Sequence, residues 1–236
     1  MKRIAMRRVA FVAAVLLVLV AIGALTVVRA SPYIAVALVI TLALAPFLAA
    51  FERTRPDARE VVLIAVLTAL AVASRAVFAF VPHFKPMAGV VIIAGIALGA
   101  RSGFLVGALS ALASGFLFGQ GPWTPFQMLA FGAAGALFGF LAQRGVVPRS
   151  RLRPGQCIAL AAAGFAFVVL VLGPILDTST LLLLMSSLNP ASVAAVYLAG
   201  LPVNAIHGTA TALTLALAAN PLLGQLARVR RKYGLK

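Results

Sequence analysis

The chain has 236 residues, of which 63% are hydrophobic and 10% are charged, and its formal net charge is +16. Soluble globular domains are nearer ~45–50% apolar and ~25% charged, so this composition excludes a water-soluble domain and requires the bilayer as solvent. The apolar runs are continuous and about 20 residues long, which favours transmembrane helices over the shorter, alternating strands of a barrel. We therefore predict an all-α membrane protein.

Apolar segments follow one another along the chain. They are predicted at 9–28, 32–51, 61–80, 86–99, 102–119, 122–142, 156–176 and 191–218. The segment 86–99 is short for a span and is expected to tilt or to use flanking residues. The stretches between the later segments, including 82–86, 119–125 and 177–190, are predicted as turns. The chain is thus divided into two N-terminal helices with a charged loop (1–59), a six-helix bundle (60–218) and a basic tail (219–236).

The first segment has a second interpretation. Basic residues from Lys2 to Arg8 precede it, and the sequence Val28-Arg29-Ala30 is similar to a signal-peptide cleavage site. The apolar run exceeds the ~7–15 residues of a typical signal-peptide core, so a first transmembrane helix is favoured and cleavage is the alternative.

The basic residues mark one side of the membrane. If the N-terminus is cytoplasmic, nearly all of the 20 Lys and Arg fall on the cytoplasmic side. The exceptions are Arg29 and Lys85, which fall outside, and Arg75, which lies within a predicted helix. The positive-inside rule then predicts an even number of spans with both termini in the cytoplasm. Because the cations gather at helix ends and not on a basic face interleaved with aromatics, nucleic acid is excluded as a partner.

Several kinds of chemistry have no motif in this sequence. There is no Walker A pattern, no GxSxG and no HExxH, and His83 and His207 have no acids at metal-ligand spacing. Cys157 is the only cysteine. Apart from Asp177, near an outer helix end, the carboxylates fall in the loop that precedes segment 61–80, so no intramembrane acid is available for a proton relay. We expect neither enzymatic activity nor a metal or cofactor.

Small residues recur at helical spacing in four segments. They are Ala65, Ala69 and Ala73, then Gly95, Gly99, Gly103 and Gly107, and later Gly135 and Gly139. Small-xxx-small patterns allow close helix approach. The glycines are interpreted as crossings inside the bundle, whereas the alanine stripe fits either internal packing or an external partner.

The outer turn GQGPWTPFQM, residues 119–128, is the first candidate for ligand binding. Proline and glycine fix its geometry, and it offers Gln120, Trp123, Thr124 and Gln127 as an aromatic surface with hydrogen-bonding groups. The alternative is an interfacial tryptophan anchor.

Further candidates are polar residues at the same predicted end of the bundle. They are Arg75, His83, Lys85, Asn204 and His207. A membrane-buried arginine usually lines a cavity or is paired, and Asp177 is the available acid. The alternatives are a structural ion pair or snorkelling for Arg75, a solvated lysine for Lys85, and hydrogen bonding between helices for Asn204 and His207.

The stretch from Ala65 to Gln143 resembles the S components of energy-coupling factor (ECF) vitamin transporters. The resemblance lies in the alanine-striped helix ending near Arg75, the turn PHFKP, the glycine-rich pair of helices and SGFLFGQGPWTPFQM. The loop motif is similar to a subfamily near the riboflavin and cobalamin types. The segments 9–28 and 32–51 are extra to the family pattern.

The resemblance implies a six-helix, vitamin-binding subunit of a bacterial plasma-membrane uptake transporter. It also implies partners: a transmembrane coupling subunit that binds the stripe of Ala65, Ala69 and Ala73, and two ATPase subunits that drive it. Membrane lipid is a further partner. No acidic group occurs among the candidate site residues, which disfavours a cationic ligand; a corrinoid is the first choice and a flavin the second. The alternative function is a membrane enzyme or assembly factor built on a similar bundle.

Overall fold

The computed structural model describes residues 58–184 and 189–233. The segments predicted at 9–28 and 32–51, and the alternative of signal-peptide cleavage, lie outside the described residues. Every element of the described part is a helix, which confirms the predicted all-α class.

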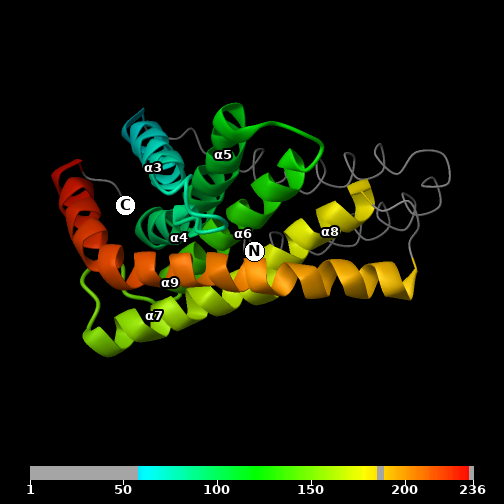
Figure 1. Cartoon of the computed structure of the whole chain (residues 1–236). Coiled ribbons are helices and arrows are strands. Elements are labelled where there is room, and N and C mark those ends of the chain that lie inside the picture. The colour runs from blue at the N-terminus through cyan, green and yellow to red at the C-terminus, as the bar shows by residue number, and fades with distance from the viewer. Residues whose placement is uncertain (1–57, 185–188, 234–236) are drawn as a thin grey trace, which may run out of the picture. The chain divides into compact units, whose positions relative to one another are not determined.

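The helices follow the predicted order. They are α3 (Ala58–Val77), α4 (Met87–Leu98), α5 (Ala100–Phe118), α6 (Thr124–Gln143), α7 (Pro154–Phe167), the π-helical turn η1 (Val168–Leu172), α8 (Gly173–Leu184) and α9 (Pro190–Tyr233). Among the described residues, α3, α5, α6, the continuous run 154–183 and α9 are long and apolar enough to cross a membrane, while α4 is shorter. Figure 1 shows α9 running alongside α7 and α8, with which it packs.

The predicted turn at 177–190 begins too early. Helix α8 continues to Leu184, so the polar run that starts at Asp177 lies inside a helix. Its hydroxyl groups bond to carbonyls of their own helix: Thr178 Oγ1 donates to the oxygen of Pro174 at 2.7 Å, and Ser179 Oγ donates to that of Leu176 at 2.6 Å. Such bonds satisfy hydroxyl groups without ending a helix. The polar residues alone therefore did not indicate where the helix ends.

Helix α9 continues past the predicted end at 218 and carries most of the basic tail. Its last turns are attached to the bundle, because Arg230 Nη1 donates to the oxygen of Ala97 at 2.7 Å and Arg59 Nη1 donates to that of Tyr233 at 3.0 Å. The bend in its red, C-terminal part is visible in Figure 1. Pro221 lies inside the helix, and prolines are common places for a helix to bend.

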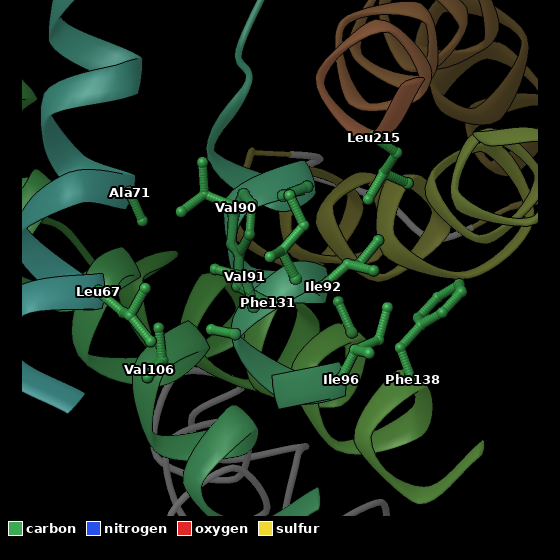
Figure 2. Packing of buried hydrophobic residues seen from close by; sticks show 14 of the residues in the cluster. Leu67, Ala71, Val90, Val91, Ile92, Ile96, Val106, Phe131, Phe138 and Leu215 are labelled. Atoms are coloured by element: carbon green, nitrogen blue, oxygen red, sulfur yellow. The ribbon is translucent and has the colours of Figure 1, made fainter. Parts of the chain in front are cut away.

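Helix α4 is the centre of the bundle. Its 12 residues span about 18 Å, less than the ~30 Å of a hydrocarbon core. All of them except Leu98 are buried, by α3, α5, α6 and α9. A helix that is apolar on every side belongs in a protein interior. Figure 2 shows its side chains Val90, Val91, Ile92 and Ile96 packed among residues of the surrounding helices.

Glycines allow α4, α5 and α6 to touch through their backbones. A Cβ atom on Gly135 would overlap the carbonyl group of Gly103, and one on Gly95 would overlap that of Gly135. A Cβ on Gly107 would likewise meet the backbone of Phe131. These contacts confirm the interpretation of the glycines as crossings inside the bundle.

The bundle has two chemically different ends. At one end, Ser102 at the start of α5 donates a hydrogen bond to Glu60 at the start of α3. At the other, Arg75 near the end of α3 donates to Ser114 near the end of α5. Most described cations belong to the first end, whereas Arg75 and Lys85 belong to the second. This second end, called here the Arg75 end, holds the candidate site.

The glycine crossing gives a first prediction. We expect Gly135→Ala to lower the free energy of unfolding by roughly 1–3 kcal/mol, because the new methyl group requires the helices to separate. The control is Gly224→Ala on α9, where no atom lies within 4 Å of the added Cβ. There we expect a gain of about 0.4–1 kcal/mol. Denaturation in detergent, followed by circular dichroism, measures both; equal effects would contradict the crossing.

Candidate functional site

Arg75 lies at the contact between α3 and α5. Its Nη1 donates to Ser114 Oγ at 2.7 Å, and its guanidinium lies 4.5 Å from the ring centroid of Phe118. Ser114 is fully buried and in turn donates to the oxygen of Ala111 at 3.1 Å. The expectation that Asp177 pairs with Arg75 is wrong, because Asp177 is bound by a residue of α9. Among the described residues, a hydroxyl and a ring orient the arginine and no carboxylate pairs with it.

The turn between α3 and α4 carries two further candidates. His83 has φ 60°, a left-handed conformation that is uncommon for a residue other than glycine. The rings of Phe78 and Phe84 lie 5.2 Å apart and close the turn. Lys85 is half-buried, and its pKa is lowered from the ordinary value by burial first and by the nearby charge of Arg75 second. The turn thus places a second cation beside Arg75.

The turn between α5 and α6 is held by its own side chains. Thr124 Oγ1 donates to Gln120 Oε1 at 2.7 Å and accepts from the nitrogen of Gly121 at 3.2 Å. Gln120 Nε2 donates to the oxygen of Leu112 at 2.8 Å. Gln120 and Thr124, both predicted as ligand-binding residues, therefore have structural bonds.

The same turn presents two groups with spare capacity. Trp123 is 40% exposed, and its ring covers Gly121 so closely that a side chain there would collide with it. Gln127 is half-buried on the first turns of α6, and its amide has no hydrogen bond with any residue of 58–184 or 189–233. Of the four candidates in this turn, these two have side chains without a hydrogen bond to the described residues.

Asn204 on α9 binds the carboxylate of Asp177 on α8. Asn204 Nδ2 donates to Asp177 Oδ2 at 2.8 Å, and Asn204 is only 5% exposed. Glycines make room for both side chains: the Asn204 amide lies against Gly173, and the carboxylate lies against Gly200. The pairing of Asn204 with Asp177 is one that the sequence did not predict.

His207 lies one turn after Asn204 and is 6% exposed. Its ring centroid is 5.9 Å from that of Phe131, and its Nε2 is buried with no hydrogen-bond partner in the described part of the chain. The fold thus brings this residue of α9 against α6, and it brings Arg75 of α3 against α5.

Sequence reasoning missed three residues of this region, namely Ser114, Phe118 and Phe131. It also missed the role of Asp177 as the partner of Asn204. A serine inside an apolar helix was the available signal for Ser114. Phe118 and Phe131 gave none, because phenylalanine is ordinary in a membrane helix. In the described ranges, no His, Cys, Asp and Glu residues are grouped as metal ligands.

The alanine stripe lies on the outer face of α3. Ala65, Ala69 and Ala73 are exposed within the described part, whereas Leu67 and Ala71 on the opposite face are buried in the core. The stripe does not pack against the described helices.

Comparison with known proteins gives one match. A family model described as "ECF-type riboflavin transporter, S component" matches residues 56–228, which include every described candidate residue. No curated protein and no solved structure matches the chain.

The contrast between His207 and Asn204 gives the second prediction. We expect His207→Leu to raise the ligand-free free energy of unfolding by about 1–3 kcal/mol, because it removes a buried group that lacks a partner. We expect Asn204→Leu to lower it by a similar amount, because the carboxylate of Asp177 loses its donor. Both variants sit on the same face of α9 and receive the same new side chain. Thermal unfolding in detergent tests the pair, and two losses of equal size would mean that His207 is a structural residue.

Proposed function

This chain belongs to the family of ECF-type riboflavin transporter S components, and from that premise we propose that it captures a flavin at the Arg75 end of the bundle and passes it to an energy-coupling module. S components are the substrate-specific, vitamin-binding subunits of these transporters, and they are not enzymes. The observation that carries the proposal is His207, whose Nε2 is buried and has no hydrogen-bond partner among the described residues.

A flavin fits the chemistry of this end better than the corrinoid that the sequence favoured. The matching family is described by riboflavin. A flat ring system can stack on Trp123, and rings with offset or edge contact gain about 0.5–1.5 kcal/mol beyond burial. Gln127 and His207 offer both donors and acceptors for ring carbonyl and imide groups. Asn204 reaches the ligand only on the side of its amide that Asp177 leaves free.

The orientation proposed is that the Arg75 end faces outward and both termini face the cytoplasm of a bacterial cell. The support is the uneven distribution of cations, which favours the cytoplasm for the end that carries Arg101, Arg144 and the basic turns of α9. A ligand site at the other end is then open to the outside, as uptake requires.

The proposed contact with a transmembrane coupling subunit is the alanine stripe of α3. Small side chains let helices approach closely in a bilayer, where packing and not the hydrophobic effect drives association. Within the described residues Ala65, Ala69 and Ala73 are exposed, which supports their role as a contact with another protein. ATP hydrolysis would come from two ATPase subunits bound to the coupling subunit.

Riboflavin titration into the purified full chain tests the ligand. Trp123 is the only tryptophan, so its fluorescence reports binding in the parent protein. For Trp123→Ala and Gln127→Ala, flavin fluorescence replaces that signal. We expect at least one of the two to weaken binding roughly tenfold, about 1.4 kcal/mol.

Unchanged affinity in both variants would limit the α5–α6 turn to an anchoring role and leave the site around Asn204 and His207. If riboflavin does not bind, mass spectrometry of co-purifying small molecules identifies the vitamin, and a corrinoid there would replace the flavin in this proposal.

The docking stripe is tested separately. We expect Ala69→Trp to abolish vitamin uptake in cells and to leave the affinity of the purified protein for the vitamin unchanged, because a large side chain prevents close helix approach. The matched control is Ala162→Trp, at an exposed position of α7, which should transport normally. Loss of both binding and uptake in Ala69→Trp would mean that the stripe packs within the protein.

A further inference from the structure

A pocket of about 220 Å³ lies at the other end of the bundle, between α6, the α6–α7 loop (residues 144–153) and α7. Its lining is mostly apolar and includes Phe138 of α6, Leu152 of the loop and Leu160 of α7. Because one span ends and the next begins at this loop, the pocket lies where the hydrocarbon core meets the lipid headgroups. An apolar cavity of roughly 150 Å³ is enough to hold benzene, so this pocket has room for a length of acyl chain.

The α6–α7 loop is held in place by side chains. The nitrogen of Leu152 donates to Asn220 Oδ1 at 2.7 Å, and Asn220 Nδ2 donates to the oxygen of Leu152 at 3.1 Å. These two bonds attach the loop to α9, near the bend of that helix in Figure 1. At the start of α7, the nitrogen of Arg153 donates to the Oε1 atom of Gln156, a lining residue, at 2.9 Å. The wall of the pocket is therefore formed before a ligand arrives, which limits the entropy lost on binding.

Arginines border this apolar pocket. Pro148 and Leu152 line it, and their neighbours in the chain are Arg149, Arg151 and Arg153. Consecutive Cα atoms are about 3.8 Å apart, so these three side chains begin at the edge of the pocket. The loop contains no acid, and none of the three arginines has an ion pair with a described residue. An apolar cavity beside uncompensated cations fits a ligand with an apolar chain and an anionic group.

Arg149 provides separate evidence of a missing partner. Its Nε is buried and has no hydrogen-bond partner among the described residues. Buried polar atoms are nearly always hydrogen-bonded, and the planar guanidinium matches the geometry of phosphate oxygens. Residues 1–57 carry seven Lys and Arg against two acids, so their charge does not complement that of the loop. Charge complementarity therefore favours a phosphate from the surrounding lipid over that segment of the chain.

We propose that this pocket binds an anionic phospholipid, with one acyl chain in the apolar cavity and the phosphate on Arg149 and Arg151 of the α6–α7 loop. Basic pockets between transmembrane helices are suited to anionic headgroups, because cations near the membrane surface attract them. The proposal goes beyond the proposed function and does not depend on which vitamin is bound, because the pocket lies at the end of the bundle opposite the Arg75 end. In the proposed orientation, the lipid belongs to the cytoplasmic leaflet.

The headgroup is tested on the purified full chain in a neutral detergent. Native mass spectrometry compares the binding of dioleoyl phosphatidylglycerol and dioleoyl phosphatidylcholine, which differ in charge but not in acyl chain. We expect roughly tenfold tighter binding of phosphatidylglycerol, and a loss of about fivefold in Arg151→Gln. The matched control is Arg228→Gln, which removes an exposed cation of α9 outside the pocket and should leave the preference unchanged.

The acyl chain is tested by filling the cavity. We expect Ala159→Phe, at an exposed lining position of α7, to weaken the binding of phosphatidylglycerol roughly tenfold, because the ring displaces several methylene groups. Ala162→Phe is the control, since Ala162 is also exposed on α7 but does not line the pocket. Circular dichroism of each variant shows that it is folded.

Four outcomes would overturn the proposal. Equal binding of the two lipids would reject the role of the arginines, and absence of any bound lipid would reject the site. An equal loss in Arg151→Gln and Arg228→Gln would mean that anionic lipid responds only to the overall charge of this end. Unchanged binding in Ala159→Phe would mean that the acyl chain does not enter the cavity. None of these results bears on vitamin binding, so the proposed function stands or falls separately.

Discussion

The described bundle depends on backbone contact among α4, α5 and α6. Gly103 and Gly135 meet with no room for a side chain, and Gly95 joins them from α4. Helices α3, α5, α6 and α9 enclose α4, which is too short to cross a bilayer, so α4 lies in protein and not in lipid. Helix α5 also packs against α3, and there Arg75 donates its hydrogen bond to Ser114.

Polar groups at that end fall into two sets. One set is used by the fold: Gln120 and Thr124 bind each other and the α5 backbone, and Asn204 binds Asp177. The other set has capacity left over, namely Trp123, Gln127, Lys85 and His207. The residues of the first set hold the turn and the helices in place, and the hydrogen-bonding groups of the second set are not consumed by the fold. Such pre-organisation limits the conformational entropy that a binding site loses when a ligand binds.

Most of the described helices could be predicted from the sequence, whereas the ligand-binding role of the candidate residues stays a prediction. Apolar length located the spans, and glycine spacing located the crossings, because both are periodic properties of the chain. The partners of individual polar groups could not be predicted. Asp177 was named as the acid available to Arg75 because opposite charges commonly pair, yet the hydrogen bond of Arg75 goes to Ser114. The polar run after Asp177 was predicted as a turn because the sequence does not show whether a hydroxyl bonds to a carbonyl of its own helix or ends that helix. In the structure, the hydroxyl of Thr178 bonds within its helix. Such pairings depend on tertiary distances.

The π-helical turn η1 affects how this chain aligns with its relatives. A π turn holds one residue more than the α-helical turn it replaces, so it corresponds to a single insertion accepted without breaking the helix. Each residue of an α-helix advances about 100° around the axis. A relative that lacks the extra residue would present α8 rotated by about that angle, and the carboxylate at position 177 would no longer face Asn204. In a sequence alignment, a relative with one residue fewer between positions 168 and 172 would therefore belong to a branch of the family whose site is built differently.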